Sequence, residues 1–507
     1  MPPQYPPTQT AARTVRYLSP LWCSDGVTAK HKPLPDSGWV RAERALGSSE
    51  APVSGTPCRN TQTLIMAHIF NTGPLRGSSF SRSETGDLLC EGRPLAAIAQ
   101  QFGTPTFVYA ERMITDAYQS FSQAAQGRDA LICYALKANS SLAIIRLLAQ
   151  QGAGFDIVSI GELQRVLACG GSVDRVVFSG VGKKPEEISA ALHAKIKCIN
   201  VESEAELEMI SSIATQQGSR APISIRVNPD IDAKTHPYIS TGLKENKFGI
   251  PMESAVAVYQ KAATLPGIDI QGIDCHIGSQ ITDIQPFLDS LERVLDLVAV
   301  LDRQKIQIHH LDLGGGLGIT YEQESPPSPK EMLNALFGRI DAWSQSRKAA
   351  APEVLFEFGR AIVGNAGLLL TRVELLKPGR EKNFAVIDAA MNDLMRPALY
   401  DAWHGVEPLA NNRVDADHTK WDLVGPVCES GDWIAKDREL SLSSGDLLAI
   451  LSAGAYAMSM SSNYNSRPKA AEVLVDLNGD AHLIRRREVF EDLILTERIP
   501  AYLLGNT

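Results

Sequence analysis

The feature that most constrains the fold of this chain is an alternation of short apolar runs with amphipathic helices, which repeats from about residue 104 to residue 365. The helices carry clear start signals: Pro185 is followed by two glutamates, and Ser203 precedes Glu206 in a capping box. Repeated strand–helix units of this length are typical of a parallel sheet, and about eight of them close into a barrel. We therefore predict an α/β fold in which residues 104–365 form a (β/α)8 TIM-type barrel. The predicted strands are Thr106–Tyr109, Ala130–Tyr134, Phe155–Ser159, Val176–Ser179, Cys198–Val201, Ile223–Val227, Ile270–His276, Ile308–Leu313 and Val354–Phe358.

The rhythm of the sequence changes after about residue 366. Short strand-like runs alternate there with Gly and Asn turns, for example Arg372–Leu376, Phe384–Asp388 and Ala471–Val475. This pattern predicts a C-terminal β-rich domain over residues 366–507.

The first 65 residues differ in composition from the rest of the chain. They contain nine of the 29 prolines, carry a net charge of +3 and show no sustained hydrophobic periodicity. Such a segment lacks the apolar material for a packed core. We expect residues 1–65 to be a disordered extension, or to precede the true start of translation, for which Met66 is a natural position.

Composition argues against several classes of protein. The net charge of −9 argues against nucleic acid or an anionic membrane as the main partner. No run approaches the roughly 18 apolar residues of a membrane-spanning helix. The eight cysteines are scattered without a Cys-x-x-Cys pair, and the ten histidines form no ligand-spaced cluster. We therefore expect no metal site and no disulfide framework, which fits a reducing cytoplasm.

A lysine stands at the carboxyl end of a predicted buried strand. Lys137 follows the apolar run Ala130–Tyr134, and a helix is predicted to begin after Ser140 and Ser141. Burial disfavours the ammonium form, so we expect a lowered pKa and a nucleophilic amine. Such an amine forms a Schiff base with an aldehyde cofactor. Taken alone, such a residue is more often a lysine that reaches from the strand end to solvent.

Three further polar clusters follow predicted strands. Gly314–Gly316 form a glycine loop in which backbone N–H groups can approach a phosphate, because no Cβ intervenes. Glu357 and Arg360 end a second strand, and His276 ends a third, three residues before Ser279. Each cluster alone is usually structural. Four polar clusters at the carboxyl ends of strands in one barrel would meet at one face, and together they match the chemistry of pyridoxal phosphate.

These residues carry a family resemblance. The chain resembles the pyridoxal-phosphate decarboxylases of the alanine-racemase-like barrel class, and within that class the diaminopimelate decarboxylases. One departure is Glu357-Phe358-Gly359-Arg360, where the family usually has Glu-Pro-Gly-Arg, so the fixed φ of proline is absent. The resemblance covers most of the chain and implies that residues 66–103 join the C-terminal β-domain. The other matching segments are Gly154–Ser159, Arg226–Pro229, Lys247–Gly249, Arg396–Tyr400, Cys428–Asp432 and Gly454–Tyr456.

The resemblance implies a role for each candidate residue. Lys137 would hold the cofactor, Glu357 would keep its pyridine nitrogen protonated, and His276 would stack on its ring. Arginines would grip a distal carboxylate of the substrate, Glu429 would receive its distal ammonium, and Cys428 would return a proton after CO2 leaves. The implied cofactor contacts are Lys137, His276, Ser279, Gly314, Gly315, Gly316, Glu357, Gly359, Arg360 and Tyr456. The implied substrate contacts are Arg360, Arg396, Tyr400, Glu429 and Tyr456.

The activity implied by the resemblance is decarboxylation of meso-2,6-diaminopimelate to L-lysine and CO2, the last step of lysine biosynthesis. In this family the Cys-Glu segment enters the active site of the partner subunit, so the resemblance also implies a homodimer. Two alternatives remain open: a related decarboxylase of ornithine, arginine or carboxynorspermidine, and a non-catalytic pyridoxal-phosphate-binding barrel protein. A racemase is disfavoured because Glu357 would make the cofactor ring a strong electron sink.

Overall fold

The computed structural model describes residues 79–503, apart from 233–235, 237–238, 240, 243–245 and 411–418. All of the described residues belong to one compact unit, Ile69–Thr507. The expected extension over residues 1–65 lies outside the described residues.

Eight parallel strands form a closed barrel. Each strand pairs with the next in the chain, and the last pairs with the first. This confirms the predicted TIM-type architecture, and it brings the carboxyl ends of the strands to one face. The strands are β5 (Ala130–Ala135), β6 (Gly154–Ile157), β7 (Val176–Phe178), β8 (Cys198–Val201), β9 (Ala221–Asn228), β11 (Ile268–Asp274), β12 (His310–Asp312) and β13 (Glu353–Phe358), with the two-residue β10 (Ile250–Pro251) added beside β9.

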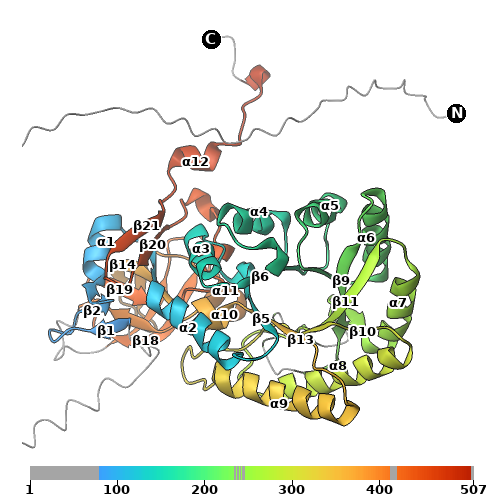
Figure 1. Ribbon diagram of the computed structural model, residues 1–507. Helices are drawn as coiled ribbons and strands as arrows, with labels where there is room; N and C mark the ends of the chain where they lie inside the picture. Colours follow the sequence, from blue (N-terminus) through green and yellow to red (C-terminus); the bar gives the residue numbers. More distant parts are fainter. Residues whose placement is uncertain are drawn as a thin grey trace, which may run out of the picture. The chain divides into compact units, whose positions relative to one another are not determined.

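Helices cover the outside of the barrel (Figure 1). Their starts follow the expected signals: the Ser203 hydroxyl accepts a hydrogen bond from the Glu206 N–H, and Pro185 is the first residue of its helix. Inside the barrel, residues such as Leu131, Val177 and Leu355 form a buried cluster drawn from different strands. The helices are α2 (Glu111–Ala124), α3 (Leu142–Gln150), α4 (Ile160–Ala168), α5 (Pro185–Ala194), α6 (Glu204–Gln216), α7 (Met252–Thr264), α8 (Gln285–Arg303) and α9 (Pro329–Arg347).

A second, β-rich region is built on the long strand β14 (Gly367–Lys377), which pairs with β15 and β19 on its two flanks. One of its strands corrects the sequence-based prediction. We expected Thr106–Tyr109 to start the barrel, but the strand β4 (Thr106–Ala110) lies between β14 and β20 in this second sheet. Its five residues are all buried, so periodicity could not assign it to either sheet. The remaining strands are β15 (Phe384–Ile387), β16 (Val406–Pro408), β17 (Thr419–Val424), β18 (Trp433–Leu440), β19 (Leu447–Ile450), β20 (Ala471–Val475) and β21 (Ala481–Arg485).

The N-terminal part of the described chain packs on this β-rich region. Three short strands, β1 (Phe80–Arg82), β2 (Leu88–Cys90) and β3 (Arg93–Pro94), form a small sheet that leads into α1 (Leu95–Phe102). Leu88 and Leu95 share a buried cluster with residues of β4, β14 and β19. Among the described helices, none is long and apolar enough to cross a membrane.

A loop of the β-rich region lies against the turn that carries Lys137. The Tyr456 N–H donates to the Ala138 carbonyl over 2.8 Å, and the Asn139 amide donates to the Gly454 carbonyl over 3.1 Å. Two segments far apart in the sequence are thereby joined at the carboxyl-end face of the barrel.

Candidate active site

Lys137 lies in the short turn Leu136–Ala138 that follows β5. Its Nζ is 2.5 Å from Oδ2 of Asp156 on β6, and about 33% of its side chain is exposed. Burial alone would lower the pKa of Lys137, as expected from the sequence. The nearby carboxylates of Asp156 and Glu357 outweigh that effect and raise the pKa above its ordinary value. The expectation of a lowered pKa was therefore wrong for the site without its cofactor.

Three buried carboxyl groups meet where β11, β12 and β13 end. Oxygen atoms of Asp274, Asp312 and Glu357 all lie within 4.8 Å of one another, a spacing that would also suit a cation. Burial and the mutual repulsion of the carboxylates raise the pKa of Glu357 and Asp274 well above the ordinary range, and burial raises that of Asp312 to about 6. The cluster therefore keeps protons to a higher pH than isolated carboxyl groups do. Arg226 forms an ion pair with this cluster, with its Nε 3.8 Å from Oδ2 of Asp274.

The glycine loop after β12 is a turn that only glycine fits. A Cβ on Gly315 would lie 2.0 Å from the Glu357 carbonyl oxygen, and one on Gly316, at φ +104°, would lie 2.3 Å from the Gly278 carbonyl oxygen. The Gly315 N–H donates to Nδ1 of His276 over 3.1 Å. Burial lowers the pKa of His276 well below its usual range, so its ring is neutral. The loop thus holds a flat, uncharged ring beside the carboxyl cluster.

Two buried guanidinium groups lie beside this loop. Arg360 donates to the Tyr321 hydroxyl over 2.6 Å and to the Ser279 hydroxyl over 3.0 Å, and its Cζ is 4.8 Å from the ring centre of Tyr456. Arg396, at the start of α11 (Arg396–Tyr400), has its Cζ 4.3 Å from the ring centre of Tyr321. Their exposed fractions are 5% and 6%.

Neither arginine has a countercharge among the described residues. No carboxylate there lies within ion-pair distance of Arg360 or Arg396, and the Nε atom of each is buried without a hydrogen-bond partner. Unpaired buried charges are costly, so the two guanidiniums are suited to receive an anion. Burial lowers the pKa of Arg396, and the positive charge of Arg360 adds to that effect.

Cys428 and Glu429 are the predicted site residues that the described structure does not join to the others. Both are exposed and lie on the loop between β17 and β18. The Cys428 N–H donates to the side chain of Asn465, and a hydrogen bond with Glu429 raises the pKa of Tyr464. Contacts of this loop therefore run to the segment around Tyr464 rather than to Lys137.

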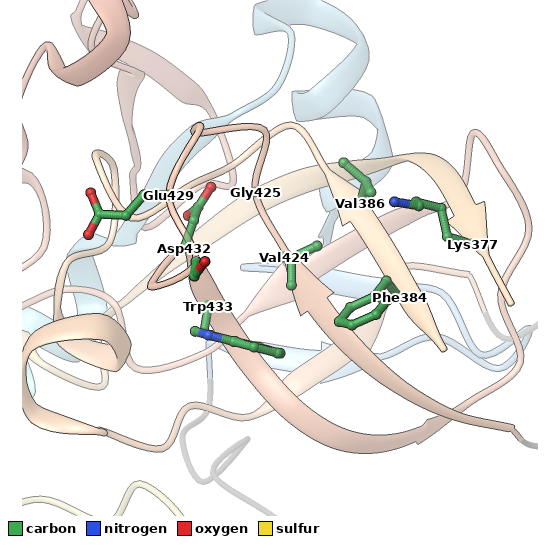
Figure 2. Close-up of a pocket in the computed structure, with 9 residues that line it drawn as sticks. Lys377, Phe384, Val386, Val424, Gly425, Glu429, Asp432 and Trp433 are labelled. Carbon is green, nitrogen blue, oxygen red and sulfur yellow. The ribbon is translucent and has the colours of Figure 1, made fainter. Parts of the chain in front are cut away.

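The loop also borders a pocket of about 320 Å³ (Figure 2). Phe384, Val424 and Trp433 line its apolar part, with Glu429 and Lys377 at opposite ends. This pocket lies on the β-rich region and contains none of the residues grouped around Lys137.

Besides Asp156 and Arg226, which lie in the matching segments, four residues of this arrangement were not named as site residues in the sequence analysis. Asp274 and Asp312 are the last residues of their strands, a position that could have marked them. Tyr321 lies five residues beyond the glycine loop, and His404, which accepts from Arg396, follows α11. Nothing in the local sequence pattern marks either residue, because their partners are distant in the chain.

Two comparisons with known proteins identify the family of this chain. Residues 111–364 match the family model for the pyridoxal-binding domain of pyridoxal-dependent decarboxylases. A diaminopimelate decarboxylase of Vibrio cholerae is 52% identical over 83% of this chain and 99% of its own length. The chain belongs to the diaminopimelate decarboxylase family.

Solved structures of the family share the fold. The diaminopimelate decarboxylase of Helicobacter pylori in complex with L-lysine is 41% identical, with a TM-score of 0.75 over 80% of this chain and 99% of that one. The enzyme of M. jannaschii is 37% identical, with a TM-score of 0.79 over 84% of this chain and 99% of that one. A lysine/ornithine decarboxylase of Vibrio vulnificus, at 22% identity and a TM-score of 0.65, shares the fold alone.

Proposed function

We propose that this chain catalyses the pyridoxal-phosphate-dependent decarboxylation of meso-2,6-diaminopimelate to L-lysine and CO2, the last step of lysine biosynthesis. Membership of the diaminopimelate decarboxylase family supports this function. The observation that carries it in the structure is the pair of buried guanidiniums, Arg360 and Arg396, which lack a countercharge among the described residues. A substrate with a second carboxylate, remote from the one it loses, supplies that charge bidentately.

The residues around Lys137 fit pyridoxal phosphate. Lys137 would bond the aldehyde carbon, the neutral His276 would lie against the ring, and Glu357 would face the ring nitrogen. The loop at Gly314–Gly316, with Ser279, would hold the phosphate through N–H and O–H donors. When bound, the cofactor supplies an electron sink for the electron pair of the breaking carbon–carbon bond.

The protein's own groups manage protons and exclude water. Burial and the neighbouring carboxylates raise the pKa of Glu357, so this carboxyl group can supply a proton at the ring nitrogen. The ion pair with Asp156 favours the ammonium form of Lys137. The ring of Tyr456 lies against the guanidinium of Arg360 and the ring of Tyr321 against that of Arg396, so aromatic faces shield both cations from water.

Cys428 and Glu429 enter the proposal through a second copy of the chain. Both are exposed, and their hydrogen bonds run to Tyr464 and Asn465 rather than to the residues around Lys137. We infer a homodimer in which this loop completes the site of the partner, with Cys428 as the proton donor and Glu429 as the acceptor of the distal ammonium. We also propose a cytoplasmic location, in keeping with the six described cysteines, which are all free thiols.

An assay of CO2 release from a panel of amino acids tests the proposed function. The panel contains meso-diaminopimelate, lysine, ornithine, arginine and carboxynorspermidine. We expect kcat/KM for meso-diaminopimelate to exceed that for every other member by roughly 10⁴-fold or more, because a substrate without the distal carboxylate leaves the arginines unpaired. Faster release from a substrate without that carboxylate would contradict the proposal, and no release from any member would favour a non-catalytic binding protein.

A further inference from the structure

A buried histidine holds one of the two arginines in place. His404 is fully buried between α11 and β16, with its Nδ1 2.8 Å from the Leu451 carbonyl oxygen and its Nε2 2.8 Å from Nη1 of Arg396. A carbonyl oxygen can only accept and a guanidinium can only donate. The ring is therefore neutral, with its proton on Nδ1 and its Nε2 lone pair aimed at Arg396.

Other contacts keep this histidine in that state. Burial and the positive charge of Arg396 lower the pKa of His404 well below its usual range. Nη2 of Arg438 donates to the His404 carbonyl over 2.9 Å and so anchors its backbone. Because the ring of His404 stays neutral, its Nε2 remains a hydrogen-bond acceptor. It therefore satisfies one donor of Arg396, which has no carboxylate partner among the described residues.

Tyr321 joins this histidine to the second arginine. Its ring lies edge-on to His404, with centroids 5.3 Å apart, and Arg396 lies over its face at 4.3 Å. Its hydroxyl accepts from Arg360 over 2.6 Å. Tyr321 is thus an aromatic spacer between two cations, stabilising one through its π face and the other through its oxygen. His404 comes from the β-rich region and Tyr321 from the barrel, so this chain of contacts crosses between them.

We propose that His404 and Tyr321 are specificity-determining positioning residues, which hold Arg396 and Arg360 in the orientation that receives the distal carboxylate of the substrate. The inference rests on the proposed function and extends it to residues that do not contact the reacting atoms. One hydrogen bond occupies a single N–H group of Arg396, and its Nε has no partner among the described residues. The remaining donors are therefore oriented and available for the ligand.

The test compares His404→Leu with His404→Gln in the cofactor-loaded protein. Leucine removes the acceptor, whereas the glutamine amide can accept from Arg396 and donate to Leu451. The hydrogen bond between His404 and the charged Arg396 contributes free energy to the orientation of the guanidinium. Its loss should raise KM for meso-diaminopimelate roughly 10- to 100-fold. We expect kcat to change much less, the preference for meso-diaminopimelate over lysine to fall by the same factor as KM rises, and His404→Gln to restore most of it.

Two further variants keep the test decisive. Tyr321→Phe retains the ring and removes only the hydroxyl, so it should raise KM for meso-diaminopimelate without loss of the cofactor's visible absorbance, even if His404→Leu fails to fold. His310→Leu is the matched control: His310 is also a buried histidine, hydrogen-bonded to Ser224, and its loss should leave the preference ratio unchanged.

Specific outcomes would overturn the inference. An unchanged KM in both His404→Leu and Tyr321→Phe, or an equal fall in turnover of meso-diaminopimelate and lysine, would show that these residues only support the fold. If the wild type shows no preference for meso-diaminopimelate over lysine, the proposed substrate itself is wrong, and that result is visible before any variant is made.

Discussion

The Nζ atom of Lys137 lies 2.5 Å from Oδ2 of Asp156, and this ion pair reverses the titration expected of a buried lysine. An amine attacks an aldehyde only in its neutral form. The pair therefore makes attachment of the cofactor dependent on pH, because the proton must leave Lys137 first.

Asp156→Asn should shift cofactor attachment to lower pH. Asp156 makes the largest contribution to the raised pKa of Lys137, so an amide at that position should lower that pKa. Attachment is measured as the rate of growth of the visible absorbance when pyridoxal phosphate is added to the apoprotein between pH 6 and 10. The control is Lys137→Ala, which should show no such absorbance and no borohydride-fixed label. A fixed label on another lysine would refute the assignment of Lys137.

Asp312→Asn should stabilise the apoprotein at alkaline pH. The carboxyl of Asp312 has a folded-state pKa of about 6, above its ordinary value, because of burial. A group with a raised pKa contributes stability below its unfolded-state pKa and loses it as pH rises through the folded-state value. The free energy of unfolding of the wild type should therefore fall relative to the variant by roughly 1–3 kcal/mol between pH 4 and pH 8. Urea unfolding at the two pH values measures it, with Asp296→Asn on the exposed face of α8 as the control.

Cys428→Ala should bind the cofactor and turn over slowly. Loss of a general acid typically costs ~10²–10⁴-fold in rate. Mixing this variant with Lys137→Ala subunits should restore part of the activity, because one of the two hybrid sites would contain both a lysine and a cysteine. A verified heterodimer that regains no activity would show that each site is built within a single chain.

Arg396→Ala should erode the preference for meso-diaminopimelate. The variant removes one of the two buried cations proposed to bind the distal carboxylate. We expect kcat/KM for meso-diaminopimelate to fall by about 10²-fold or more, while the weak turnover of lysine falls far less. Arg396→Lys is the informative companion, since an ammonium keeps the charge but lacks the bidentate fork, and it should recover only a small part of the loss.

Phe358→Ala should lower stability more than it alters the site. Phe358 is fully buried, with its ring 4.0 Å from that of Phe121 on α2 and 5.5 Å from that of Phe356. Removing a buried phenylalanine ring typically costs about 3–5 kcal/mol in the free energy of unfolding. Phe490→Ala, at an exposed phenylalanine, is the control. An equal effect of the two substitutions would contradict the packing role. Where the family usually has proline, Phe358 places an aromatic ring in contact with α2.

Local sequence was sufficient to predict the barrel and the elements that present its site. Alternating apolar runs and helix signals specify strands and helices over short windows, so eight strands were placed to within a few residues. The grouping of Lys137, His276, Gly314–Gly316 and Glu357 followed from one topological fact, that parallel strands of a barrel end at the same face. The roles assigned to these residues remain predictions.

Tertiary structure decided what local pattern cannot encode. Local pattern could not assign the strand Thr106–Ala110 to the second sheet, because its partners there, β14 and β20, lie more than 250 residues away in the chain. The pKa of Lys137 rose instead of falling because electrostatic energy depends on distances in space, and Asp156 is close only in the folded chain. His404 and Tyr321 met the two arginines for the same reason. The sequence by itself determined which elements form and which face carries the chemistry. Contacts between neighbouring barrel strands determined the charge state of the groups that act there, and contacts between the barrel and the β-rich region oriented the two arginines.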